Sequence, residues 1–255
     1  MAERVAIVTG AGSSQGIGYA IAQALLAASY RVAITATTAR SDERVRELNA
    51  GGGRVLPLAC DLRGESAAAE MIERVVARFG GVDVLVNNAG MTSVSDPIAE
   101  ASFLDLDVNA WRERMDITLT TCFCATRAVL PHLIARGGGR IVNVASVTGP
   151  YVSSPGESAY SAAKAGMVGL TRALAVEFGA RGITVNAVAP GWIATASSTP
   201  RELDGGRRTP VGRAGRPEEV AAAVVFLASP AASYINGEVL VIDGGNILQE
   251  HKGPE

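Results

Sequence analysis

The stretch VAIVTGAGSSQGIGYAIAQALLA, residues 5–27, decides the fold. It begins with a short apolar run, passes through a glycine-rich loop and opens an alanine-rich segment with helical spacing. In such a strand–turn–helix unit, glycines let backbone N–H groups approach a pyrophosphate, and the helix N-terminus adds positive potential. The loop therefore indicates a dinucleotide site, with a structural glycine-rich turn as the alternative. The loop residues expected to contact the cofactor are Gly10, Gly12, Ser13, Ser14, Gln15, Gly16, Ile17 and Gly18.

Short apolar runs and longer helical segments alternate along the whole chain. The expected strands are Val5–Thr9, Arg31–Ala36, Val55–Ala59, Val82–Asn87, Arg140–Ser146, Thr184–Ala189 and Val239–Ile242. The expected helices are Ile17–Ser29, Glu43–Ala50, Ser66–Phe79, Trp111–Arg136, Ala159–Ala180 and Pro217–Ser229. This alternation predicts an α/β fold with one doubly wound parallel sheet of the Rossmann type and helices on both faces. No linker divides the chain, so we expect residues 1–255 to form a single dinucleotide-binding and catalytic domain.

Composition narrows the class of protein. Hydrophobic residues make up 48% and charged residues 19% of the 255 residues, which argues against disorder. The net charge of −2, without a basic cluster, argues against nucleic acid. The start of the chain does not resemble a signal peptide, and no uninterrupted apolar run reaches about 18 residues. We therefore expect a cytoplasmic protein that does not enter a membrane.

The cysteines and histidines give no sign of metal or redox chemistry. Cys60, Cys122 and Cys124 are odd in number and lack the two-residue spacing of zinc or redox pairs, so we interpret them as packing residues in a reducing compartment. His132 and His251 are poor candidates for catalysis, and no metal ligand set is expected.

The end of the second predicted strand bears on the choice of cofactor. It has no Asp or Glu where an NAD site would bind the ribose 2′-hydroxyl. Thr37, Thr38 and Arg40 could instead hold a 2′-phosphate, which predicts NADP(H) in preference to NAD(H). The alternative is that Arg40 is only a solvated residue before a helix.

Motifs spread over nearly the whole chain resemble those of the short-chain dehydrogenase/reductase family. They are Thr9–Gly18, Asp61-Leu62, Asn87-Asn88-Ala89-Gly90, Ile141–Ser146, Tyr160-Ser161-Ala162-Ala163-Lys164, Asn186, Pro190-Gly191 and Asp243-Gly244-Gly245. The segment from Pro210 to Asp243 is similar to bacterial 3-oxoacyl-acyl-carrier-protein reductases and related ketone, alcohol and sugar reductases. The resemblance implies a homotetramer.

The resemblance also implies further cofactor contacts. Asp61 and Leu62 would lie at the adenine, although a turn-capping role for Asp61 is the alternative. Asn88, Ala89 and Gly90 would leave room for the cofactor beside a structural Asn87. Pro190, Gly191, Ile193 and Thr195 would flank the nicotinamide amide and a phosphate, unless Pro190-Gly191 only ends a strand.

The candidate catalytic residues are Ser146, Tyr160 and Lys164. A tyrosine has a reference pKa of about 10, and a nearby cation favours its phenolate. Tyr160 and Lys164 are one helical turn apart, so both can reach one site. Ser146 ends an apolar strand, where its hydroxyl could donate to a carbonyl oxygen. The resemblance adds a ribose contact for Lys164.

Two positions depart from the family pattern. Five residues separate Gly10 from Gly16, where the common pattern has three. Thr118 stands where family members usually carry an asparagine that holds a helix irregularity and a water near the catalytic lysine. We expect the Thr118 hydroxyl to bond back to a carbonyl about one turn earlier and to support such a water.

These features predict a reductase that transfers hydride from NADPH to a 3-oxoacyl thioester or ketone. An NAD-dependent alcohol or sugar dehydrogenase, and a dinucleotide-binding regulator with weakened catalysis, are the alternatives. An acyl carrier protein as partner would need basic residues at the mouth of the site, for which Arg127, Arg136 and Arg172 are candidates.

Overall fold

The computed structural model describes residues 3–48, 53–90 and 101–250. Within them, seven parallel strands form one sheet in the order β3-β2-β1-β4-β5-β6-β7. Strands β2 and β3 are added on one side of β1 and strands β4 to β7 on the other, so the switch point of the topology lies between β1 and β4. This confirms the predicted doubly wound sheet. The strands are β1 (Val5–Val8), β2 (Arg31–Ala36), β3 (Val55–Ala59), β4 (Val84–Asn87), β5 (Gly139–Val144), β6 (Ile183–Pro190) and β7 (Val239–Ile242).

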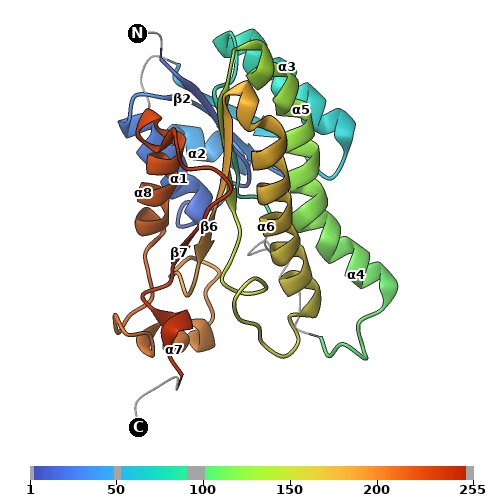
Figure 1. The fold of residues 1–255 in the computed structure, drawn as a ribbon, viewed down its shortest axis with the longest axis vertical. Coiled ribbons are helices and arrows are strands. Elements are labelled where there is room, and N and C mark those ends of the chain that lie inside the picture. Colours follow the sequence, from blue (N-terminus) through green and yellow to red (C-terminus); the bar gives the residue numbers. More distant parts are fainter. Residues whose placement is uncertain (1–2, 49–52, 91–100, 251–255) are drawn as a thin grey trace.

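Helices cover both faces of the sheet, with α1, α2 and α8 on one face and α3, α5 and α6 on the other (Figure 1). Ala6 and Val8 of β1 pack toward α1 and α8, whereas Val5 and Ile7 pack toward the opposite layer. The strands are apolar at consecutive residues because both faces are buried. The α-helices are α1 (Ile17–Ala27), α2 (Arg40–Leu48), α3 (Glu65–Phe79), α4 (Val108–Met115), α5 (Thr121–Ala135), α6 (Ser158–Phe178), α7 (Pro200–Arg207) and α8 (Pro217–Ala228). The shorter helical turns are η1 (Asp116–Thr120), η2 (Gly179–Arg181), η3 (Pro230–Ala232) and η4 (Asn246–Leu248).

The helix predicted at Trp111–Arg136 differs from the structure in two ways. It begins at Val108, because Asp107 Oδ1 accepts hydrogen bonds of 2.8 Å from two backbone N–H groups of the first turn. It is also interrupted by the π-helical turn η1 between α4 and α5, where Thr121 Oγ1 donates to Asp116 O at 3.0 Å. Such π-turns are often found at functional sites.

Two other helices also differ from the prediction. Helix α2 begins at Arg40 rather than Glu43, and the predicted end at Ala50 lies outside the described residues, as does His251. Helix α7 was not predicted, since Gly205 and Gly206 argue against a helix. A capping box at Thr199 and Glu202 nevertheless begins it.

The stretch Val108–Ala135 is long and apolar enough, by length and composition alone, to cross a membrane. However, 50% of its most apolar window is buried inside the fold, and α5 packs against the sheet. The apolar character of this stretch is therefore that of a core helix.

Arginines occupy the amino edge of the sheet, where the helices end. Arg54 Nη2 donates to Leu26 O at the end of α1 (2.7 Å), and Arg4 Nη1 donates to Ala228 O at the end of α8 (2.9 Å). These bonds satisfy helix C-terminal carbonyls that have no partner within the helix. Arg136 also lies at this edge, paired with Asp83 at 3.0 Å just before β4.

Candidate active site

The glycine loop packs directly against the loop after β4. Gly10 has φ +70°, and a Cβ on it would lie 2.7 Å from Ala89 Cα. A Cβ on Gly18 would lie 2.5 Å from Asn88 Nδ2, so the start of α1 also needs glycine at this position. These glycines bring the ends of β1 and β4 together at the carboxyl edge.

Thr9, which the sequence reading did not single out, fixes this arrangement. Its Oγ1 accepts hydrogen bonds of 3.0 Å from the backbone N–H groups of Asn88 and Ala89. In return, Asn88 Nδ2 donates to Thr9 O (3.0 Å) and Gly10 O (2.9 Å). In the sequence, Thr9 ends the predicted strand Val5–Thr9 and begins the family motif Thr9–Gly18, but neither feature indicated these hydrogen bonds.

The residues at the start of α1 fit the pyrophosphate of a dinucleotide. Gly16 caps the helix without a side-chain hydrogen bond, and the first turn carries no acidic residue. No carboxylate of the first turn therefore neutralises the positive end of the α1 dipole, which favours binding of an anion there.

Arg40 lies beside the glycine loop. Its Nε donates to Thr38 Oγ1 at 3.1 Å, and a Cβ on Gly12 would lie 3.8 Å from the same nitrogen and 3.1 Å from Ala36 Cβ. Thr37 and Thr38 are exposed beyond the end of β2. The structure thus brings together the three residues predicted to discriminate NADP from NAD.

Asp61 follows β3 and pairs with Arg63. One of its carboxylate oxygens accepts from the Arg63 backbone N–H at 3.1 Å, and the Arg63 guanidinium holds the pKa of the carboxyl below its usual range. This is the turn-capping role considered above, whereas the adenine contact stays a prediction. Leu62 is buried beside it.

Ser146, Tyr160 and Lys164 lie together at the carboxyl edge. Ser146 comes two residues after β5, and its hydroxyl lies close enough to that of Tyr160, near the start of α6, to oppose the rise of the Tyr160 pKa. Lys164 Nζ lies 5.7 Å from the centroid of the Tyr160 ring. The structure therefore brings these three predicted side chains together at one edge of the sheet.

The groups of the protein itself do not lower the pKa of Tyr160 as expected. Burial raises the pKa of the Tyr160 hydroxyl to about 12, and the neighbouring Ser146 hydroxyl only partly opposes this rise. The Lys164 ammonium donates to Val144 O (2.8 Å) instead of to the hydroxyl, and burial lowers its own pKa to about 8. A buried cation aimed at a carbonyl gives the phenolate little support.

Thr118 is buried in η1, but its hydrogen bond differs from the one expected. Its Oγ1 donates to Gly90 O at 2.9 Å, across to the loop after β4, rather than to a carbonyl of its own helix. Thr118 bonds to Gly90 because the two backbones approach closely: a Cβ on Gly90 (φ +132°) would lie 3.0 Å from Thr118 Cα. The helix irregularity is present with Thr118 in place of the usual asparagine.

The segment after β6 lies next to the end of β7. Gly191 N donates to Ile242 O at 3.0 Å, while Thr195 Oγ1 lies 3.0 Å from Ser197 Oγ. Helix α7 packs on this segment, because a Cβ on Gly205 would lie 2.8 Å from Trp192 Cε2. Ile193 follows Trp192 and forms a bridge with Gly215.

Asn87 has the structural role expected for it, through side chains rather than backbone. Its Nδ2 donates to Asn143 Oδ1 on β5 and to Thr126 Oγ1 on α5, both at 2.9 Å. Asn186 is structural too, since its side chain bonds Ile235 O and the Glu238 N–H.

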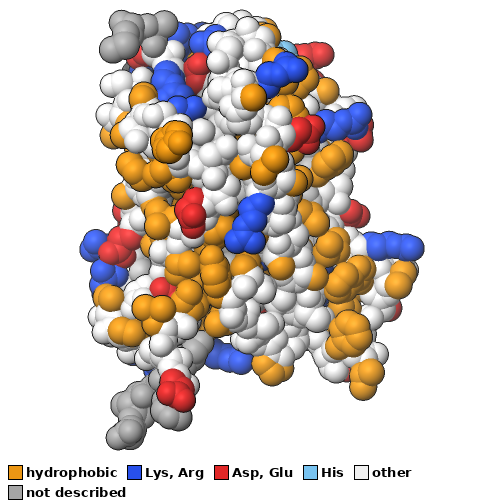
Figure 2. Space-filling view, viewed as in Figure 1, with side chains coloured by type: hydrophobic (Ala, Val, Ile, Leu, Met, Phe, Trp, Pro, Cys, Tyr) orange, Lys and Arg blue, Asp and Glu red, His pale blue; other side chains and the backbone are white. Residues whose placement is uncertain are grey.

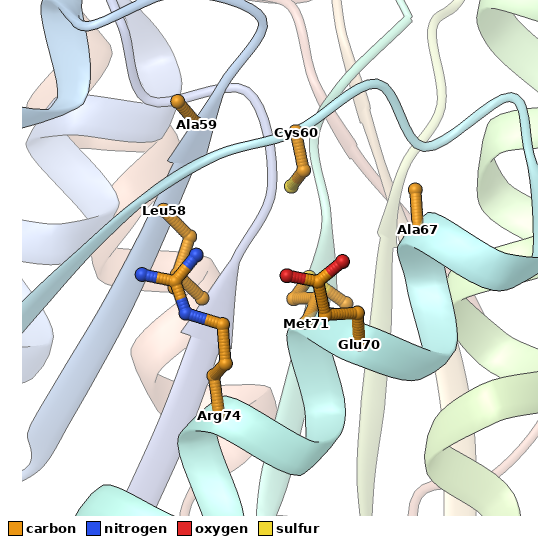
Figure 3. A pocket seen from close by; sticks show the side chains of 7 residues that line it. All are labelled: Leu58, Ala59, Cys60, Ala67, Glu70, Met71 and Arg74. Carbon is orange, nitrogen blue, oxygen red and sulfur yellow. The ribbon is translucent and has the colours of Figure 1, made fainter.

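A cavity of about 160 Å³ lies beside β3 and α3. Figure 3 shows the side chains that line it. Cys60, Glu70 and Arg74 point toward it, and burial raises the pKa of the Cys60 thiol to about 11. Because β3 is an edge strand separated from β5 by three strands, this cavity is remote from Ser146 and Tyr160. Cys122 and Cys124 are buried thiols, as predicted, whereas Cys60 is only partly buried.

The arginines considered for an acyl carrier protein do not gather at one place. Arg136 lies at the amino edge of the sheet, away from the site, because α5 runs antiparallel to the strands. Arg127 pairs with Glu65 at 2.6 Å. The expectation for Arg136 at the mouth of the site is therefore wrong.

Comparison with known proteins places the chain in a family. Residues 10–246 match the family model described as Enoyl-(Acyl carrier protein) reductase. The chain is 44% identical to cis-4-hydroxycyclohexanecarboxylate dehydrogenase of Sinomonas cyclohexanicum over 96% of both proteins. It is 38% identical to a 3-oxoacyl-[acyl-carrier-protein] reductase of Synechocystis sp. (strain ATCC 27184 / PCC 6803 / Kazusa), over 96% of this chain and 97% of that protein.

A solved structure shows the same fold. It is a double mutant of a Serratia marcescens short-chain dehydrogenase/reductase, which superposes with a TM-score of 0.86 at 31% identity, over 96% of this chain and 98% of that one. The resemblance drawn from the motifs is thereby confirmed. The chain belongs to the short-chain dehydrogenase/reductase family of oxidoreductases.

Proposed function

We propose that residues 1–255 form one catalytic domain that reduces a carbonyl group to a secondary alcohol with NADPH, on 3-oxoacyl thioesters or ketones. The observation that carries the proposal is the grouping of Ser146, Tyr160 and Lys164 at the carboxyl edge, with the buried Lys164 ammonium 5.7 Å from the centroid of the Tyr160 ring. The 38% relative named as a 3-oxoacyl-[acyl-carrier-protein] reductase supports the substrate class.

Membership of the family implies a nicotinamide dinucleotide, and the loop at the end of β1 would hold it. The uncapped start of α1 would bind the pyrophosphate through backbone N–H groups. The segment Asn88–Gly90, fixed by Thr9, would form the adjoining wall. When bound, NADPH supplies the hydride that reaches the substrate carbon.

Each catalytic side chain then has a distinct role. Tyr160 gives the proton of its hydroxyl to the substrate oxygen, which becomes the alcohol. Ser146 donates a hydrogen bond as negative charge develops on that oxygen. Lys164 holds a positive charge within the site and donates to a ribose hydroxyl, because only one of its three N–H groups is used by Val144 O.

The preference for NADPH rests on Arg40. Its guanidinium lies beside Gly12 and Thr38, and no acidic residue lies between Arg31 and Arg40 to repel a 2′-phosphate. A charged, bidentate donor suits a phosphate.

A second candidate function is oxidation of a secondary alcohol with NAD. It is favoured by the 44% identity to a relative named as a dehydrogenase of a hydroxycyclohexane carboxylate. The same side chains would serve this reaction in reverse, with the Tyr160 phenolate as base.

A two-directional activity screen distinguishes the candidates. NADPH and NADH oxidation would be followed with acetoacetyl thioesters, simple ketones, diketones and keto-sugars, and NAD(P)⁺ reduction with cis-4-hydroxycyclohexanecarboxylate. We expect the highest kcat/KM with NADPH and a 3-oxoacyl thioester or ketone. Oxidation of the cyclic alcohol with NAD⁺, without reduction of any thioester or ketone, would replace the first proposal with the second.

A further inference from the structure

A chain of buried polar side chains runs behind the catalytic helix. Asn143 on β5 is fully buried, and its Oδ1 accepts from Asn87 Nδ2 on β4 at 2.9 Å. Its Nδ2 donates to Thr171 Oγ1 on α6 at 2.8 Å. Asn87 Nδ2 also donates to Thr126 Oγ1 on α5 at 2.9 Å. These bonds connect the central strands β4 and β5 to two of the helices that cover them, α5 and α6.

Helix α6 is thereby hydrogen-bonded to two consecutive residues of β5, Asn143 and Val144. Thr171 accepts from Asn143, and Lys164 Nζ donates to Val144 O, both at 2.8 Å. Lys164 and Thr171 are seven residues apart, so they lie on one face of α6 about two turns from each other. Thr171 donates its own proton to Met167 O at 2.8 Å, which leaves its oxygen free to accept from the Asn143 amide.

Stability alone does not explain these buried hydrogen bonds. Apolar side chains of the same shape could fill the space at nearly the same stability, and Asn87 Oδ1 has no hydrogen-bond partner among the described residues. Hydrogen bonds, however, are directional and of fixed length, so they set where a helix lies along a strand more sharply than apolar contacts do. That placement matters here, because a shift of about 1 Å in a catalytic group can cost on the order of 100-fold in rate.

We propose that Asn143 and Thr171 are positioning residues, which hold α6 so that Tyr160 and Lys164 stay aligned with Ser146. The catalytic effect of this positioning rests on the proposed function. Both side chains lie in the core behind the site. Thr171 acts by holding the helix, and it does not contact the substrate.

The sequence offers a direct probe of Lys164. It contains two lysines, Lys164 and Lys252, so labelling lysine with ¹³C at Cε gives two NMR signals, which Lys252→Arg assigns. Burial lowers the pKa of Lys164 to about 8. The titratable groups beside it are the Cys122 thiol of α5, whose pKa burial raises to about 12, and Tyr160 on its own helix.

The test compares two threonines that both bond to these buried asparagines. Thr171→Val and Thr126→Val each remove a buried hydroxyl that accepts from an asparagine amide, but only Thr171 lies on the catalytic helix. We expect Thr171→Val to lower kcat by about 10- to 100-fold. We also expect the Lys164 titration midpoint to rise toward its ordinary value of 10.5, because a loosened α6 admits water.

Thr171→Ser restores the hydroxyl and should return both readouts close to those of the wild type, and Thr126→Val should leave both unchanged. If Thr171→Val does not fold, Thr171→Ala makes the same comparison with a residue that favours helix. The proposal is overturned if Thr171→Val and Thr126→Val lower the melting temperature alike while kcat and the midpoint stay at wild-type values. A wild-type protein that reduces no carbonyl would reject the proposed function, whereas the NMR midpoint would still decide the positioning role.

Discussion

The Lys164 ammonium donates a 2.8 Å hydrogen bond to the main-chain oxygen of Val144, the last residue of the strand that leads to Ser146. Lys164 is 1% exposed, and no carboxylate forms an ion pair with it among residues 3–48, 53–90 and 101–250. No ion pair within these described residues therefore neutralises its positive charge, and two of its N–H groups are available to acceptors from a bound ligand. This contact underlies the roles proposed for Lys164.

Replacing Lys164 tests both roles. Lys164→Ala should reduce turnover and also weaken NADPH binding, because the variant loses the charge beside Tyr160 and the proposed ribose contact. Titration of NADPH fluorescence measures the affinity independently of catalysis. An unchanged dissociation constant would rule out the ribose contact, even if turnover fell.

Arg40 should set the cofactor preference. Arg40→Ser should lower kcat/KM for NADPH by about 10- to 100-fold, the loss expected for a charged hydrogen bond, and leave NADH little affected. Arg46→Ser, which removes an exposed arginine from the same helix, is the control for charge alone. Equal efficiency with NADH and NADPH in the wild type would overturn the assignment.

Thr118 tests the proton supply to the site. Thr118→Asn retains a donor for Gly90 O and adds an amide oxygen in η1, so we expect higher turnover or a shifted pH profile at unchanged cofactor affinity. Matched pH–rate profiles of the two proteins make the comparison. Superimposable curves would show that the side chain at this position has no part in proton delivery.

We expect a homotetramer, and Gly169 on α6 offers a test. It is exposed, and a Cβ on it would meet nothing within 4 Å, whereas a Cβ on Gly166 would lie 2.8 Å from Leu119. Glycine within a helix costs about 1 kcal/mol relative to alanine, so a close neighbour from another copy is one reason to keep it.

Apolar side chains also gather on the face shown in Figure 2. Among the exposed apolar residues are Val108, which begins α4, and Val176, near the end of α6. Light scattering should give a tetramer for the wild type and a smaller species for Gly169→Arg, with unchanged circular dichroism. A wild-type monomer at micromolar concentration would contradict the prediction.

The sequence predicted the sheet because its signal is periodic and local. Apolar runs such as Ile141–Val144 are buried on both faces and are bounded by glycine or polar residues, so the strands and a doubly wound parallel sheet could be inferred. The grouping of Ser146, Tyr160 and Lys164 followed from helical spacing and from the carboxyl edge of the sheet. The site was thus predictable where it depended on position along single elements.

What the sequence did not predict depends on contacts between distant segments. Thr118 bonds Gly90 O because the loop after β4 passes close to η1, which helical spacing alone does not reveal. Burial under other elements raises the pKa of Tyr160, and the neighbouring Ser146 hydroxyl only partly opposes this rise. Helix α7 begins through a capping box that was present in the sequence, but its two glycines masked the signal.

The central claim is that Tyr160 is the acid–base group of a carbonyl reductase, and the Tyr160→Phe variant tests it most directly. The substitution removes the hydroxyl that faces Ser146 and keeps the ring beside Lys164. NADPH oxidation with the best carbonyl substrate of the wild type should fall nearly to background, while NADPH affinity stays close to that of the wild type. Substantial reduction by the variant, at matched cofactor saturation, would contradict the account.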